Sequence, residues 1–104
     1  MRDQKSSMKT TVVVGLGSSG ISAARLLNRE GREVVVLEKS TSPKVSKDAK
    51  QLQEEGIEVR LGNALEIKSF QALSKPLDCI VISPGVPWNH PTLETLRKSG
   101  VSIK

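Results

Sequence analysis

The stretch Thr11-Val12-Val13-Val14-Gly15-Leu16-Gly17-Ser18-Ser19-Gly20 decides the fold of this chain. A run of β-branched residues ends in the pattern G-x-G-x-x-G, and a helical spacing of apolar residues begins directly behind it. A strand, a glycine turn and a helix in this order aim several backbone N–H groups and the positive end of a helix dipole at one point. The stretch therefore predicts a site for a phosphate or pyrophosphate group at the start of the helix.

Short apolar runs alternate with helical patterns along the rest of the chain, which is typical of a parallel α/β sheet. We expect strands at 11–14, 33–37, 57–61, 77–82 and 101–104, and helices at about 19–30, 47–55, 64–73 and 92–99. Ser46 is the expected N-cap of the second helix, behind a polar loop over 40–43. The predicted fold class is α/β, with a Rossmann-like, open, mostly parallel sheet of about five strands and helices on both faces, in three layers.

The chain has 104 residues, which is enough for one small domain with a single core. We expect residues 10–104 to form that domain and the polar residues 1–9 to be a flexible leader. Because the last residues look like part of a strand, we expect a fragment of a longer, multidomain protein. No apolar run is long enough to cross a membrane, and the N-terminal segment lacks the apolar core of a secretory signal.

Cysteine content and charge limit the cell compartment and the partners. Cys79 is the only cysteine, so the sequence predicts no intrachain disulfide and a cytoplasmic location. It lies in the apolar run 79–82, where a thiol usually acts as a small buried hydrophobe. The net charge is +5, but the basic residues are scattered and form no block of like charge. We therefore expect a solvated surface and no nucleic-acid partner.

The residues of the glycine motif have separable roles. Gly15 permits the tight turn out of the strand, Gly17 lets a phosphate approach the backbone, and Gly20 lets the helix pack closely on the sheet. Ser18 and Ser19 can add hydroxyl donors at the same place. The alternative interpretation is that the glycines serve only a tight strand-to-helix turn.

Two further groups lie at the ends of expected strands. Glu38 ends the second strand, 18 residues after Gly20, where an acidic residue can accept hydrogen bonds from ribose hydroxyls or can be a solvated charge. Lys39 beside it is either a cation near phosphate or a surface residue. The turn Ser83-Pro84-Gly85 follows the fourth strand at the same edge and can form a wall for a base ring, although a plain turn uses similar residues.

Nothing in the chain predicts a chemical step. The only histidine, His90, precedes a helix and is interpreted as part of the start of that helix, because no cluster of metal ligands accompanies it. There is no Ser-His-Asp arrangement, no pair of catalytic carboxylates and no G-x-x-x-x-G-K-[ST] loop. We expect no catalytic residue, no metal site and no bound cofactor within these residues.

Taken together, these features resemble the N-terminal domain of the Mur ligase family, in the branch that adds D-glutamate to UDP-N-acetylmuramoyl-L-alanine. The matching segments are Val14 to Ala24, Gly31 to Glu38, and Ser83-Pro84-Gly85-Val86-Pro87 followed by His90-Pro91. The resemblance covers about 11–104. The Ser-Pro-Gly-Val-Pro turn is its more specific part, since many dehydrogenases share the glycine loop.

The resemblance implies that this domain holds the UDP part of the substrate. It implies contacts of Gly17, Ser18 and Ser19 with the diphosphate, of Glu38, Lys39 and Ser40 with the uridine, and of Ser83, Pro84 and Gly85 with the uracil. The sequence departs from the family at two positions. The family commonly has Asp where the longer Glu38 stands, and often a small hydroxyl residue where Lys39 stands.

The resemblance also implies what the rest of a full-length protein contributes. A central domain binds ATP and Mg²⁺ and phosphorylates the alanine carboxylate, the amine of D-glutamate attacks the acyl phosphate, and a C-terminal domain closes over the site. The implied partners are the UDP-sugar substrate and the other domains of the same chain, in a monomer. Two alternatives stay open at this point: an NAD(P)-binding domain of an oxidoreductase, and a non-catalytic nucleotide-sensing module.

Overall fold

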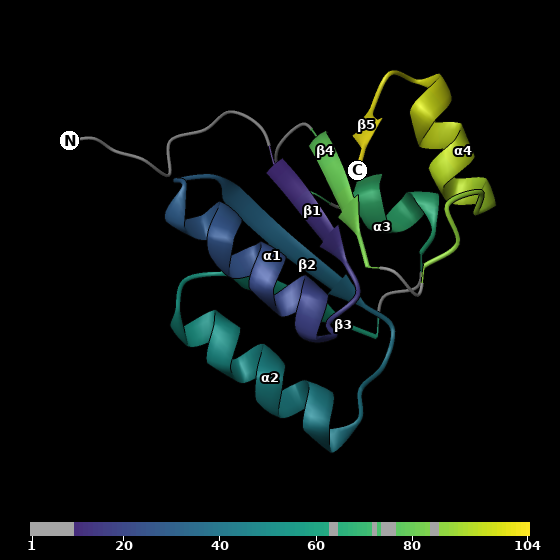
Figure 1. The fold of residues 1–104 in the computed structure, drawn as a ribbon. Coiled ribbons are helices and arrows are strands. Elements are labelled where there is room, and N and C mark those ends of the chain that lie inside the picture. The colour runs from purple at the N-terminus through teal and green to yellow at the C-terminus, as the bar shows by residue number, and fades with distance from the viewer. Residues whose placement is uncertain (1–9, 63–64, 72, 74–76, 84–85) are drawn as a thin grey trace.

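The computed structural model describes residues 10–62, 65–71, 73, 77–83 and 86–104. They form one open sheet of five parallel strands in the order β3-β2-β1-β4-β5: β1 (Thr10–Val14), β2 (Glu33–Glu38), β3 (Glu58–Leu61), β4 (Leu77–Ile82) and β5 (Ser102–Ile103). Between them run α1 (Ser18–Arg29), α2 (Pro43–Glu54), α3 (Ile67–Gln71) and α4 (Pro91–Lys98). The predicted fold class, a Rossmann-like parallel sheet in three layers, is confirmed (Figure 1).

Helices cover the sheet on both faces. Helices α1 and α2 pack on one face, where Val13 and Val36 meet Ala24 of α1 and Leu52 of α2. Helices α3 and α4 pack on the other face, where a second apolar cluster joins them to the sheet; its fully or nearly buried members are Val12, Val14, Val35, Leu37, Phe70, Ile80 and Leu93. Because β1 is buried on both faces, its sequence is continuously β-branched instead of alternating.

The strand order places β1 at a switch point. From β1 the chain builds outward through β2 to β3, and then returns to add β4 and β5 on the other side of β1. The loop after β1 leads to α1 on one face, whereas the segment after β4 leads to α4 on the opposite face. Loops that diverge in this way open a crevice beyond the carboxyl ends of the two strands, where open α/β sheets bind ligands.

The start of α2 differs from the prediction. The sequence analysis placed this helix at 47–55 with Ser46 as the N-cap, but it begins at Pro43 and its N-cap is Ser42. The Ser42 hydroxyl accepts a hydrogen bond of 3.3 Å from the N–H of Val45. Proline suits the first position of a helix because its φ is already helical and its missing N–H would have no partner there. The expected polar loop is therefore partly the first turn of the helix.

The other boundaries lie close to the predicted ones, with two shorter elements. Helix α3 spans Ile67–Gln71 instead of 64–73, and residues 64 and 72 lie outside the described residues. Strand β5 spans Ser102–Ile103 instead of 101–104, although the N–H of Lys104 still donates to the carbonyl of Ile80 at 2.8 Å. The expected leader, residues 1–9, also lies outside the described residues.

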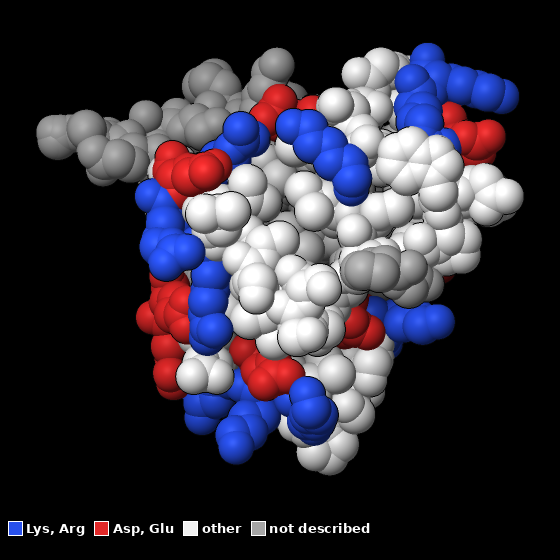
Figure 2. All heavy atoms as spheres, in the orientation of Figure 1, with Lys and Arg blue, Asp and Glu red and all other residues white. Residues whose placement is uncertain are grey.

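The surface carries mixed charge. Figure 2 shows Lys and Arg interspersed with Asp and Glu around one face, while uncharged residues occupy its centre. Arg25 of α1 pairs with Glu55 at 2.8 Å, and these hydrogen bonds hold the pKa of Glu55 below its ordinary value. Arg32 pairs with Asp78 at 3.4 Å. In the part of the chain that the structure describes, no helix has both the length and the apolar character needed to span a membrane.

The corrected start of α2 gives a testable prediction. Ser42→Ala removes the capping acceptor and is expected to lower the free energy of unfolding by about 1 kcal/mol. Ser46→Ala is the matched control, because the Ser46 hydroxyl makes only a 3.5 Å contact with the carbonyl of Thr41. Urea unfolding of both variants measures the difference, and an equal or larger loss in Ser46→Ala would contradict the assignment of the cap.

Candidate functional site

The glycine loop is held by a very close approach between the end of β1 and the start of α1. Gly15 has a φ of +102°, a conformation that favours glycine, and its N–H donates to the carbonyl of Leu37 at 2.9 Å. A Cβ atom added to Gly20 would lie 2.0 Å from the carbonyl oxygen of Gly15. The predicted roles of these two glycines, in the turn and in helix-to-sheet packing, therefore have a direct structural basis.

Gly17 differs from the other two glycines of the motif. It is the N-cap of α1, with an ordinary extended φ of −91°, and a Cβ added to it would meet nothing within 4 Å. Among the described residues, no side-chain hydrogen bond from the N-cap closes this helix, and Ser18 and Ser19 are exposed. The first N–H groups of a helix lack partners within the helix, so this end presents open donors and the positive end of the dipole. Because Gly17 has no side chain, an anion can approach its backbone closely.

Glu38 lies against the glycine loop. One carboxylate oxygen accepts the N–H of Leu16 at 2.7 Å, and the other accepts the N–H of Ser40 at 2.9 Å. The Ser40 hydroxyl in turn accepts the N–H of Ser42 at 3.2 Å, so it supports the loop that leads into α2. Lys39 is exposed. Of these three predicted uridine contacts, only the Glu38 side chain is in hydrogen-bond contact with the glycine motif.

Ser83 joins the end of β4 to the same loop. Its N–H donates to the carbonyl of Val14 at 3.1 Å, and its hydroxyl donates to the carbonyl of Gly15 at 3.4 Å. A Cβ added to Gly15 would lie 2.7 Å from the Ser83 hydroxyl oxygen, so the serine fills the space that the glycine leaves. Pro84 and Gly85, the other two predicted uracil contacts, lie outside the described residues.

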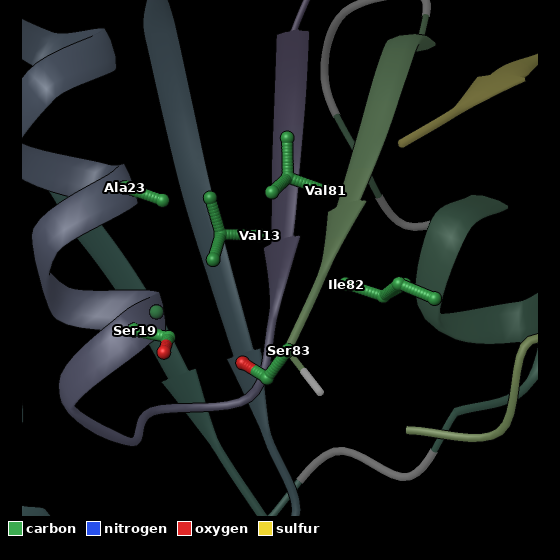
Figure 3. Close-up of a pocket in the computed structure, with 7 residues that line it drawn as sticks. Val13, Ser19, Ala23, Val81, Ile82 and Ser83 are labelled. Carbon is green, nitrogen blue, oxygen red and sulfur yellow. The ribbon is translucent and has the colours of Figure 1, made fainter. Parts of the chain in front are cut away.

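A small cavity lies at the switch point between β1 and β4. Its volume is about 110 Å³, and it is lined by Val13, Ser19, Gly20, Ala23, Val81, Ile82 and Ser83. Figure 3 shows that Ser19 comes from the first turn of α1 and Ser83 from the end of β4, near the carboxyl end of the strands, while the Ile82 side chain points toward the opposite face. Ligand pockets usually measure about 300–1,000 Å³. This cavity can therefore take one group of a nucleotide, and the remainder of a nucleotide would extend over the edge of the sheet.

The remaining candidates for chemistry have structural roles. Cys79 is buried, and its sulfur lies 3.9 Å from the Thr11 hydroxyl. His90 is the N-cap of α4, and its Nδ1 accepts the N–H of Thr92 at 3.1 Å, which confirms its predicted place at the start of a helix. Within the described ranges, no group of three or more His, Cys, Asp or Glu side chains could hold a metal ion.

The interactions that the sequence analysis missed are those of backbone groups. It did not predict that Glu38 accepts the N–H of Leu16, nor that Ser83 bonds to Val14 and Gly15. The contact between Glu38 and Leu16 follows from the register of β1 and β2. Val14 lies opposite Leu37, so Glu38 is level with Gly15, next to Leu16. Sequence spacing alone does not give that register.

Comparison with known proteins assigns the family. The family model "Mur ligase MurD-like, N-terminal domain" matches residues 9–104. The chain belongs to this family. A UDP-N-acetylmuramoylalanine--D-glutamate ligase of Synechococcus sp. (strain CC9902) is 54% identical over 97 residues, which are 93% of this chain and 21% of the relative. A relative of the same name from Prochlorococcus marinus (strain MIT 9313) is 54% identical over 92% of this chain and 21% of its own length. A third, from Trichormus variabilis (strain ATCC 29413 / PCC 7937), is 47% identical over 90% of this chain and 20% of its own length.

The MurD-like N-terminal domain described here thus spans about a fifth of the length of these curated relatives. The resemblance inferred from the glycine loop, the acidic strand end and the Ser-Pro-Gly turn is confirmed at the level of the family. The assignments of individual residues to parts of the ligand stay predictions.

The two glycines at the start of α1 give a matched prediction. Gly20→Ala is expected to lower the free energy of unfolding by about 2 kcal/mol or more, because the new Cβ meets the carbonyl of Gly15 and not a movable side chain. At Gly17 a new Cβ has open space and the backbone φ is ordinary. We therefore expect Gly17→Ala to lower the free energy of unfolding by less than about 1 kcal/mol. Chemical unfolding of both variants compares them, and similar losses would contradict the distinction.

Proposed function

We propose that this domain binds the UDP moiety of UDP-N-acetylmuramoyl-L-alanine, as the N-terminal domain of a ligase that adds D-glutamate to that substrate. The observation that carries the proposal is the open N-terminus of α1 at the β1–β4 switch point, in a chain that matches the MurD-like family over 9–104. The relatives are named as ligases that act on UDP-N-acetylmuramoylalanine, and the start of α1 supports a site for the charged part of such a substrate.

The diphosphate is proposed to lie at the start of α1. Gly17 leaves the approach to the backbone open, and the N–H groups of the first turn point out of the helix end. The hydroxyls of Ser18 and Ser19 are exposed beside them and can donate to phosphate oxygens. In this arrangement Gly15 and Gly20 shape the loop, while Gly17, Ser18 and Ser19 contact the ligand.

The uridine is proposed to extend along the carboxyl edge of the sheet. On one side of the glycine loop lie Lys39 and Ser40, which follow β2, and on the other side lies the turn that starts at Ser83 after β4. Pro84 and Gly85 enter the proposal through the family resemblance alone. A base and ribose that span this edge would fit the open crevice that a parallel sheet forms at its switch point.

The chemical step is proposed to occur on other domains of a longer protein. This assignment follows the family, in which ATP and Mg²⁺ activate the alanine carboxylate for attack by D-glutamate. We therefore propose that the 104-residue chain alone does not turn over ATP, and that the full protein acts in peptidoglycan synthesis as a monomer in the cytoplasm.

An NAD-binding role is the second candidate, and the position of Glu38 does not separate it from the UDP proposal. In dinucleotide-binding folds the acidic residue at the end of the second strand accepts hydrogen bonds from ribose hydroxyls. Here each carboxylate oxygen accepts one backbone N–H group and keeps a further lone pair, so a ribose hydroxyl of NAD or of UDP can still donate to it. No contact in the described residues specifically favours a nicotinamide ligand or a sensing module.

A titration tests the proposed function. Backbone amide resonances of the chain are followed during addition of UDP-N-acetylmuramoyl-L-alanine, and we expect saturable shifts at Gly17 to Gly20 and at Ser83. Absence of chemical-shift changes at these positions would contradict the proposed function. Saturable binding of NADH without binding of the UDP ligand would favour the oxidoreductase alternative.

Gly17→Ala is the binding-site control for this titration. Its Cβ has space in the free protein but would occupy the path of a phosphate, so we expect affinity for the UDP ligand to fall at least about tenfold while the fold is kept. Unchanged affinity in a folded Gly17→Ala variant would place the diphosphate elsewhere.

A further inference from the structure

The carboxylate of Glu38 connects two loops that flank the candidate phosphate site. One oxygen accepts the N–H of Leu16 in the glycine loop at 2.7 Å, and the other accepts the N–H of Ser40 after β2 at 2.9 Å. Leu16 is 22 residues away in the sequence, so the contact depends on the parallel pairing of β1 with β2. This side chain thus adds a second link between the glycine loop and β2, beside the hydrogen bond from the Gly15 N–H to the Leu37 carbonyl.

The contact with Leu16 satisfies a backbone group where the sheet ladder ends. The N–H of Gly15 still donates to the carbonyl of Leu37, but the next N–H, that of Leu16, turns toward the Glu38 carboxylate. Leu16 is only 4% exposed, so its backbone lies in a region where an unpaired N–H is costly. A charged acceptor makes a stronger hydrogen bond than a neutral one. Glu38 therefore stabilises the particular course of the loop between Gly15 and α1.

The same carboxylate also limits where an anion can bind. It occupies the N–H of Leu16 and brings a negative charge to that end of the loop, so a phosphate is disfavoured there. The other end of the loop, at Gly17, Ser18 and Ser19, is open and lies at the positive end of the α1 dipole. The carboxylate and the helix thus direct an anion to the same end of the loop.

We propose that Glu38 is a positioning residue, which holds the glycine loop in its phosphate-binding shape before the ligand arrives and does so through Leu16 and Ser40. Its contribution to the phosphate site is indirect, through the backbone of the loop. The inference rests on the proposed function for the identity of the ligand, but the bridge itself exists in the free chain.

The length of the side chain matters for the bridge. Aspartate is shorter than glutamate by one C–C bond, about 1.5 Å. With the backbone unchanged, we expect an aspartate at this position to lose or lengthen at least one of the two contacts, the 2.7 Å contact with Leu16 or the 2.9 Å contact with Ser40. Glu38→Asp keeps the charge and loses the reach, whereas Glu38→Gln keeps the reach and loses one of the two acceptors.

The decisive measurement is the affinity for inorganic pyrophosphate and for UDP, because two effects of Glu38→Gln have opposite signs. Loss of a negative charge beside an anion site should strengthen pyrophosphate binding by simple electrostatics. Loss of the bridge should weaken it, and we expect pyrophosphate and UDP each to bind about tenfold more weakly to Glu38→Gln and to Glu38→Asp. Calorimetric titration gives both affinities, and Glu54→Gln, at the exposed end of α2, is the control with the same change of charge.

Amide hydrogen exchange in the free protein provides a readout that does not need a ligand. We expect the Leu16 amide to exchange at least about tenfold faster in both Glu38 variants, while Val12 and Val13 in the centre of β1 keep their protection. Retained protection of β1 shows that the variants are folded. Leu16 protection equal to wild type would overturn the bridge.

The outcomes separate this inference from the proposed function. Wild-type protein that binds neither UDP nor the UDP-sugar would contradict the proposed function. Wild-type protein that binds UDP, together with Glu38→Gln that binds pyrophosphate as tightly or more tightly, would overturn the positioning role alone. Loss of uridine binding with unchanged pyrophosphate binding would likewise overturn it, because that pattern belongs to a direct contact with the nucleoside.

Discussion

The contact between Gly20 and the carbonyl of Gly15 is the constraint on which the rest of the structure depends. A Cβ at Gly20 would lie 2.0 Å from that oxygen, so the helix can start this close to the strand only without a side chain. The close start leaves a loop of only three residues between β1 and α1. It also places the N-terminus of α1 directly at the carboxyl edge of the sheet, where a ligand bound at the switch point meets it.

The neighbouring strands hold this loop from both sides. Strand β2 supplies Glu38, whose carboxylate accepts the N–H of Leu16, and Ser83, the residue directly after β4, donates to the carbonyls of Val14 and Gly15. One neighbour satisfies a donor of the loop and the other satisfies its acceptors. The N–H groups of Gly15 and Leu16 and the carbonyls of Val14 and Gly15 are thus paired, whereas the first N–H groups of α1 lack partners within the helix. A loop held in this way has little conformational freedom to lose when a ligand binds.

Features that depend on neighbouring residues in the sequence were predicted well, and features that depend on contacts between distant segments were not. The alternation of apolar runs and helical patterns is local, and it predicted the order of the elements and the parallel sheet. The predicted N-cap of α2, Ser46, was wrong. Both Ser42 and Ser46 suit an N-cap, and only the proline after Ser42 distinguishes the two positions. The bridge from Glu38 to Leu16 could not be predicted, because it depends on the register between two strands. The assignment of Ser18 and Ser19 to a ligand stays a prediction.

A domain that holds a substrate without reacting with it can still contribute to catalysis. In the proposed function the UDP moiety is remote from the carboxylate that reacts, so its binding energy serves to orient the reacting end on another domain. Such a role favours a stiff site, because a loop that moves with the ligand would transmit its motion to the distant end. The internal pairing of Leu16, Val14 and Gly15 by Glu38 and Ser83 provides that stiffness. In the same proposal, a carboxylate that accepts backbone N–H groups would fix the loop before a substrate arrives and would leave the end of α1 open for a diphosphate.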